Sequence, residues 1–248
     1  EIEDLARKTL TASLSARKFV DVIGPKGLDC TSISTGRLNV PAEQKNQAVH
    51  YGMYSVLPLT ETRTRFSLAV WELDNIERGA ADADLDALVS AAQAIAQFEE
   101  DAVYNGFSEC SITGLCELVK DSLIPMKLSN DGAVDAVTAA QNKLIENGVE
   151  SPANLIAGSD VWQVLARSAP GGSLRSLIEK QIKGKVIYAP KLKGALLAAD
   201  RGGDFELTIG QDFAIGYHSH TTETINLFMM ESFTFRIISP EALVGFSV

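Results

Sequence analysis

The segment His218-Ser219-His220 is the most metal-like cluster of side chains in this sequence. Alternate residues of a strand lie on the same face, so the two imidazoles could reach one ion. Thr221 and Thr222 follow directly and favour a solvated turn. We therefore interpret the segment as a turn and predict no metal site.

Three cysteines, Cys30, Cys110 and Cys116, are the candidate zinc ligands or disulfide partners. No Cys-x-x-Cys pair occurs, and no histidine lies near Cys110 or Cys116, so a zinc site is not predicted. An odd number of widely spaced cysteines also argues against a disulfide framework and fits a reducing cytoplasm. We expect Cys110 and Cys116 to be small buried residues.

Glu99, Glu100 and Asp101 form an acidic trio within a helical pattern. General acid–base catalysis would need a partner whose environment separates the pKa values of these carboxyl groups. The sequence shows no such partner. We therefore predict that the trio lies on a solvated helix face.

The common catalytic and nucleotide-binding motifs are missing from the sequence. It contains no GxxxxGK or GxGxxG phosphate loop, no GxSxG nucleophile motif and no HExxH zinc motif. Motifs therefore identify no catalytic machinery, and we predict that the protein is not an enzyme.

The composition is that of a globular protein with a sizeable core. Of 248 residues, 46% are hydrophobic and 22% are charged, which allows one large domain or two modest ones. The 22 Lys and Arg residues against 32 Asp and Glu residues give a formal net charge of −10, which argues against nucleic acid or an anionic membrane as a partner. No apolar run approaches the roughly 18 residues of a membrane span.

Hydrophobic periodicity predicts an α+β fold. Strands are expected on either side of a central part of the chain that is helical or mixes helices with strands. Apolar residues at helical spacing predict an amphipathic helix in residues 1–19 and a longer helix over 84–105. Asp84 can cap the start of the longer helix, and Gly106 can end it. Residues 201–248 alternate apolar and polar side chains and predict strands.

The extended segment from Arg37 to Phe66 has little apolar surface to bury on its own. Val49, Tyr51 and Met53 alternate with other residues, and residues 60–65 offer almost nothing to a core. A two-stranded arm of this kind is marginal when isolated. We expect its support to come from the core of the chain or from a neighbouring subunit.

Several short blocks, in a fixed order along nearly the whole chain, resemble the encapsulins, a family of bacterial shell proteins. Each block is weak alone, but the ordered set is specific. The blocks are Arg17–Val22, Gly24–Pro25, Thr35–Leu38, Trp71–Gly79, Arg201–Phe205, Gly210–Asp212, Ile215–Tyr217, Glu231–Phe235 and Pro240–Ala242.

The resemblance implies the α+β HK97 capsid fold, with a peripheral domain, an extended β loop and an apical domain. Closed icosahedral symmetry then implies on the order of 60 chains or a small multiple of that, with each arm buried by the next subunit. The implied divisions are 1–36 for the N-terminal part of the peripheral domain, 37–66 for the extended loop, 67–113 for the peripheral domain with its spine helix, 114–200 for the apical domain and 201–248 for the C-terminal β part of the peripheral domain.

The function implied by the resemblance is a non-enzymatic, self-assembling nanocompartment in the cytoplasm. The shell would enclose a cargo enzyme, a dye-decolorising peroxidase or a ferritin-like protein, captured on the inner wall through its C-terminal peptide. An apolar groove with a few polar anchors suits such capture. The positions that match the cargo-binding site are Leu10, Leu14, Arg17, Asp21, Ile215 and Tyr217.

Two further sites are implied by the same resemblance. Trp71, with Arg63 a strand away, matches the place where some encapsulins hold a flavin (FMN) by ring stacking, although Trp71 could equally anchor a subunit interface. No cofactor is required for a shell. The residues that match the five-fold pore, or else form a plain surface loop, are Ala169, Pro170, Gly171, Gly172 and Ser173.

Two alternatives remain open at the level of the sequence. A phage or prophage major capsid protein would have the same fold and hold DNA. An enzyme, either a flavin-dependent redox shell or a peptidase, is the other alternative, and the missing motifs argue against the peptidase. Neighbouring genes for a peroxidase or ferritin-like protein would favour the nanocompartment over the phage capsid.

Overall fold

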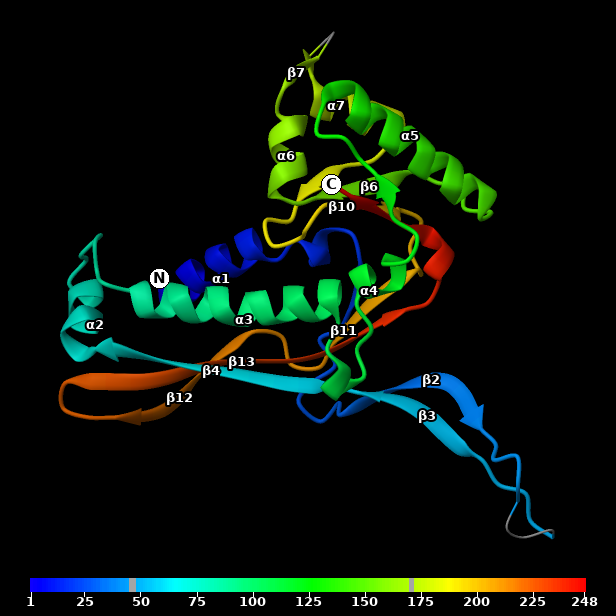
Figure 1. Cartoon of the computed structure of the whole chain (residues 1–248). Helices are drawn as coiled ribbons and strands as arrows, with labels where there is room; N and C mark the ends of the chain where they lie inside the picture. Colours follow the sequence, from blue (N-terminus) through cyan, green and yellow to red (C-terminus); the bar gives the residue numbers. More distant parts are fainter. Residues whose placement is uncertain (45–47, 170–171) are drawn as a thin grey trace.

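The computed structural model describes residues 1–44, 48–169 and 172–248. It contains a long helix lying along a twisted sheet and a smaller mixed layer stacked over one end of that helix (Figure 1). The α+β class predicted from the periodicity is confirmed. The helices are α1 (Ile2–Ser13), α2 (Val70–Glu77), α3 (Asp86–Asn105), α4 (Leu115–Val119), α5 (Asn130–Glu146), α6 (Ser159–Leu165) and α7 (Leu174–Ile182), with 3₁₀ turns η1 (Ala16–Lys18), η2 (Ser108–Cys110) and η3 (Pro240–Ala242).

The strands form two five-stranded sheets and two hairpins among the described residues. They are β1 (Asp21–Ile23), β2 (Ser32–Asn39), β3 (Met53–Pro58), β4 (Thr60–Ala69), β5 (Ile124–Pro125), β6 (Ala153–Ala157), β7 (Ser168–Ala169), β8 (Gly172–Ser173), β9 (Val186–Tyr188), β10 (Ala195–Ala199), β11 (Phe205–Ile209), β12 (Ala214–His220), β13 (Thr224–Ile237) and β14 (Leu243–Ser247).

The first sheet is organised around the long strand β13. The strand order is β1-β11-β13-β12, and β4 pairs with the other edge of β13 from Thr60 to Ala69. Apolar side chains that alternate along β4 and β13 pack against α1 and α3. Strand β12 pairs only with β13 among the described strands, so its outer edge carries no other described strand.

The long helix α3 is the spine on which this sheet rests. It spans 20 residues, or about 30 Å at the usual rise. The Asp84 carboxylate accepts a hydrogen bond from the Asp86 amide at 3.1 Å, and Gly106, with φ of +87°, ends the helix. Only glycine adopts this backbone angle without strain. The predicted spine is therefore present and begins at residue 86 rather than 84.

The second sheet, in the order β5-β14-β10-β6-β9, includes the last strand of the chain. Leu243 to Phe246 of β14 pair with β10, so the prediction that all of 201–248 belongs to the peripheral part is wrong for this strand. Its side chains are buried on both faces. A strand apolar on both faces needs a central position, which β5 and β10 provide.

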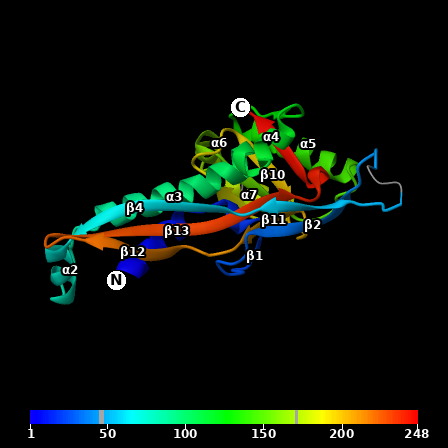
Figure 2. The ribbon, with the colours of Figure 1, turned by 90° about the horizontal axis from the view of Figure 1, so that it is seen from below.

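The projecting arm is the β2–β3 hairpin, whose strands pair only with each other among the described residues. Figure 2 shows it extending beyond the sheet at the end opposite α2. The predicted limits, 37–66, are wrong because residues 60–66 lie in β4, where Phe66 is buried against α3. The exposed apolar side chains of the arm are Leu38, Val40, Val49, Tyr51, Met53, Tyr54 and Val56.

None of the helices in the described part of the chain is both long enough and apolar enough to cross a lipid bilayer.

Candidate functional site

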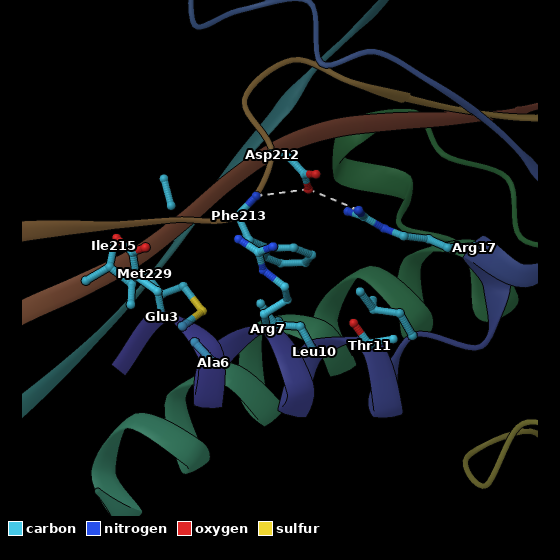
Figure 3. Close-up of a pocket in the computed structure, with 12 residues that line it drawn as sticks. Glu3, Ala6, Arg7, Leu10, Thr11, Arg17, Asp212, Phe213, Ile215 and Met229 are labelled. Carbon is cyan, nitrogen blue, oxygen red and sulfur yellow. Dashed lines mark hydrogen bonds and ion pairs between the residues drawn. The ribbon is translucent and has the colours of Figure 1, made fainter. Parts of the chain in front are cut away.

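A groove of about 580 Å³ lies between α1 and the edge strand β12 (Figure 3). It brings together four residues predicted from the sequence, Leu10, Leu14, Arg17 and Ile215. Its apolar floor is flanked by charged side chains from α1, η1 and the turn before β12. The lining residues are Glu3, Ala6, Arg7, Leu10, Thr11, Leu14, Arg17, Asp212, Phe213, Ala214, Ile215 and Met229.

The apolar floor follows from two periodicities. Ala6 and Leu10 lie one helical turn apart on α1 and are buried toward α3. Ile215 of β12 lies directly opposite Met229 of β13, so both side chains are on the sheet face that α1 covers. The groove is the gap left where the helix passes the edge of the sheet.

Two predicted cargo-binding residues, Asp21 and Tyr217, do not line the groove. The Asp21 carboxylate accepts a hydrogen bond from the Gly203 amide at 2.6 Å and so connects β1 to the loop before β11. Tyr217 shares the sheet face of Ile215 but is exposed, and its hydroxyl lies 2.5 Å from Nδ1 of His220. The cargo-binding role of all six residues stays a prediction.

The histidine segment does not form the predicted turn. Strand β12 continues through His220, and the turn comes at Thr221, whose amide donates to the Thr224 carbonyl at 2.8 Å. Both histidines are exposed. Within the described ranges no group of three or more potential metal-ligating side chains occurs.

An ionic cluster centred on Arg17 forms one wall of the groove. Arg17 Nε donates to both oxygens of Glu99, at 2.9 and 3.0 Å, and its Nη1 donates to Asp212 at 3.0 Å. Its Nη2 donates to Glu231. The guanidinium also lies 4.8 Å from the centroid of the Phe213 ring, within range of a cation–π contact.

The prediction of a solvated acidic face on the spine helix is wrong for Glu99 and Glu100. The side chains of Glu99, on α3, and Glu231, on β13, are both 0% exposed. The reason is that the helix and the strand face each other with Arg17 between them. Burial lowers the pKa of Arg17, but the hydrogen bonds and charges of its carboxylate partners outweigh this effect and raise it overall. Arg17 therefore stays charged.

A second buried network holds the chain between α1 and η1. Glu100 accepts hydrogen bonds from the Ser15 hydroxyl and, at 2.8 Å, from the Ala16 amide, while the Ser15 and Tyr104 hydroxyls are 2.7 Å apart. Burial raises the pKa values of Glu100 and Tyr104. These contacts fix the position of the backbone segment that carries the Arg17 side chain.

The three cysteines are free thiols and only partly buried, so the prediction of full burial is wrong for Cys110 and Cys116. Both pack at the margin of the core. Burial nevertheless raises the pKa of the Cys116 thiol to about 11, which makes it a poor nucleophile at neutral pH.

Three of the predicted pore residues, Ala169, Gly172 and Ser173, lie on the short strand pair β7–β8. Ala169 of β7 pairs with Gly172 of β8, and the Ser173 side chain caps the N-terminus of α7. Pro170 and Gly171 lie outside the described residues. A pore-lining role for this loop stays a prediction.

The structure separates the two predicted flavin-binding residues. Arg63 lies 5.0 Å from the Phe228 ring centroid and forms an ion pair with Glu61 at 2.7 Å. Trp71 is on α2 and is 71% exposed. About 20 Å of strand lies between Arg63 and the end of β4, after which α2 begins. An FMN site at this pair stays a prediction.

Comparison with known proteins places the chain in a family. The family model for "encapsulating protein for peroxidase" matches residues 1–234. The type 1 encapsulin shell protein of Rhodospirillum rubrum is 41% identical over 251 residues, which cover 98% of this chain and 90% of that protein. The chain belongs to the encapsulin family. The type 1 encapsulin shell protein of Brevibacterium linens is 32% identical over 250 residues, covering 100% of this chain and 94% of the relative.

Solved structures show the fold of this encapsulin. The virus-like particle from Pyrococcus furiosus matches with a TM-score of 0.67 at 15% identity, over 98% of this chain and 96% of that one. The capsid of phage XM1 matches with a TM-score of 0.61 at 12% identity, over 95% and 92% of the two chains. The predicted HK97-like capsid fold is confirmed.

The sequence reasoning missed three acidic residues that hold Arg17 in this encapsulin. Asp212 lines the groove, while Glu99 and Glu231 are buried behind Arg17. One signal was available: Glu231 is the only charge in an otherwise apolar strand face. A buried carboxylate requires a partner, so that position called for a cation from another element. Nothing in the sequence indicated that this cation is Arg17.

Proposed function

We propose that this encapsulin assembles into a closed, hollow shell and holds a cargo protein by binding the cargo's C-terminal segment in the α1–β12 groove. The cargo is a dye-decolorising peroxidase or a ferritin-like protein. The curated relatives are named as shell proteins, a structural role, and we propose the same role here. The groove itself is the observation that carries the proposal.

The shape and chemistry of the groove suit an extended peptide. Apolar side chains from α1 and β12 can take alternate side chains of such a segment, and the ordered Arg17–Asp212 pair offers polar anchoring at one end. The edge of β12 that carries no strand leaves backbone groups available to an extended partner. The exposed apolar arm supports the assembly part of the proposal, because another subunit can bury it.

We expect the Ile215→Asp protein to assemble into shells that contain little or no cargo. The substitution puts a carboxylate on the apolar floor, and a cost of about 1.4 kcal/mol already gives a tenfold loss of affinity. The readout is fluorescence per shell protein after co-expression with a fluorescent protein fused to the C-terminal segment of a dye-decolorising peroxidase or of a ferritin-like protein. Loading should fall about tenfold or more.

The matched control is Ile145→Asp, the same change on α5, where the side chain is 57% exposed and far from the groove in sequence and in the fold. This variant should load as the wild type does. Unchanged loading of the Ile215→Asp shells would exclude the groove as the capture site.

A further inference from the structure

Three carboxyl groups surround Arg17, which carries a single positive charge. Arg17 is in contact with Glu99, Asp212 and Glu231, and the first and last of these have side chains that are 0% exposed. If all three acids were ionised, the cluster would carry two uncompensated negative charges. Two like charges in a dry site cannot both be stable, so one of the buried carboxyl groups keeps a proton.

The geometry assigns this proton to Glu231. Both carboxylate oxygens of Glu99 accept a hydrogen bond from Arg17 Nε. Glu231 has only its Oε1 bound to Arg17, and its Oε2 accepts no hydrogen bond from any donor in the described part of the structure. An ionised Glu231 would therefore leave a buried carboxylate oxygen unsatisfied.

We propose that Glu231 is a positioning residue for the cargo groove: its buried carboxyl group keeps a proton, and in this neutral state it holds the Arg17 guanidinium against Phe213 and Asp212. The inference rests on the proposed function, because Arg17, Asp212 and Phe213 are residues of the groove wall. Loss of the proton adds a buried negative charge, draws water into the cluster and disorders the wall that the peptide contacts.

The elements packed around Glu231 contribute few other ionisable groups. Among the described residues, α3 provides Glu99, η1 provides Arg17 and the turn before β12 provides Asp212. Strand β4 contributes Thr62, whose hydroxyl donates to the Glu231 carbonyl at 3.4 Å. Helix α3 also carries Glu100, on which the charge of Glu99 acts.

The electrostatics give the direction of the pH dependence. Burial, and after it the charge of Glu99, raises the pKa of Glu231 well above its ordinary value. In the pH range between the ordinary and the raised value, the folded protein binds a proton that the unfolded chain has lost. Stability contributed by this group is thus lost as the pH rises through the raised pKa, and the groove wall loosens in the same direction.

The test compares wild-type shells with Glu231→Gln and Glu99→Gln shells. The probe is a dye-labelled synthetic peptide with the C-terminal sequence of the cargo fusion that loads best, and its binding is followed by fluorescence anisotropy across neutral to alkaline pH. Wild-type affinity should fall by up to about tenfold per pH unit above the Glu231 pKa. Each variant leaves only one fully buried carboxyl group in contact with Arg17, so neither should show this loss.

Two measurements keep the inference separate from the proposed function. The infrared band of a protonated carboxyl group should be present in wild-type shells at neutral pH and should weaken in Glu231→Gln. Glu206→Gln is the control, because Glu206 is a half-buried acid paired with Arg236 away from the groove, and its loss should leave the alkaline loss of binding in place.

The outcomes are distinct. If no C-terminal peptide binds at any pH, the proposed function fails, and the infrared band still decides whether Glu231 is protonated. If the peptide binds but Glu231→Gln keeps the wild-type pH profile, or leaves the carboxyl band unchanged, the positioning role of Glu231 is overturned.

Discussion

Replacing Arg17 with methionine is expected to lower the free energy of unfolding by about 3–5 kcal/mol. The substitution keeps a long apolar side chain but removes the single cation between two fully buried carboxyl groups, Glu99 and Glu231. The core would then contain buried carboxyl groups with no cation to balance their charge. The cost should appear as a lower midpoint in calorimetric thermal unfolding of the intact shells.

The matched control is Arg7→Met on α1. Arg7 is exposed and forms no ion pair or hydrogen bond with the described residues, so its loss should change stability by little. Adding Glu99→Gln and Glu231→Gln to the Arg17→Met protein should recover part of the loss, since no buried charge then remains. An Arg17→Met protein as stable as the Arg7→Met protein would contradict the role given to the cluster.

Replacing Met53 and Tyr54 with aspartate is expected to abolish shell assembly. These side chains lie on the arm and are 63% and 80% exposed in the single chain. Burying a side chain of this size against a neighbour contributes about 1.5–3 kcal/mol, and the contact is repeated at every subunit. Because the β2–β3 hairpin pairs with no other described strand, the protomer should keep its own fold.

Size-exclusion chromatography with light scattering and negative-stain microscopy measure this effect, and circular dichroism checks the fold. Met53→Leu with Tyr54→Phe keeps the apolar surface and should still give shells. Intact particles from the double aspartate variant would show that the arm is not an assembly contact. A wild-type protein found only as monomers would refute the assembly itself.

The elements predicted best from the sequence are those whose pattern is local. The spine helix was predicted within two residues of its start because its apolar spacing, Asp84 and Gly106 all lie within one continuous segment. The arm was recognised as unsupported for the same reason, since the polar run over residues 60–65 is visible without a structure. Its limits were wrong because nothing local shows that residues 60–66 pair with β13, more than 150 residues further along the chain.

The candidate groove was predicted only in part. Leu10, Leu14, Arg17 and Ile215 were named because the resemblance to the encapsulins implies a binding site at these positions, and the fold brings the four residues together. Which further residues complete the wall depends on how η1, α3 and the turn before β12 meet. Such contacts between distant segments leave no periodic signal.

The sequence by itself determined the α+β class, the long helix, the unsupported arm and the family, because each depends on residue order and spacing. The tertiary structure alone decided that Glu99 and Glu231 share Arg17 and that β14 joins the second sheet. The physical reason is that the environment of a charge is set by whatever packs around it. A glutamate on a helix is solvated or buried according to the segment that lies opposite, and only the folded chain supplies that segment.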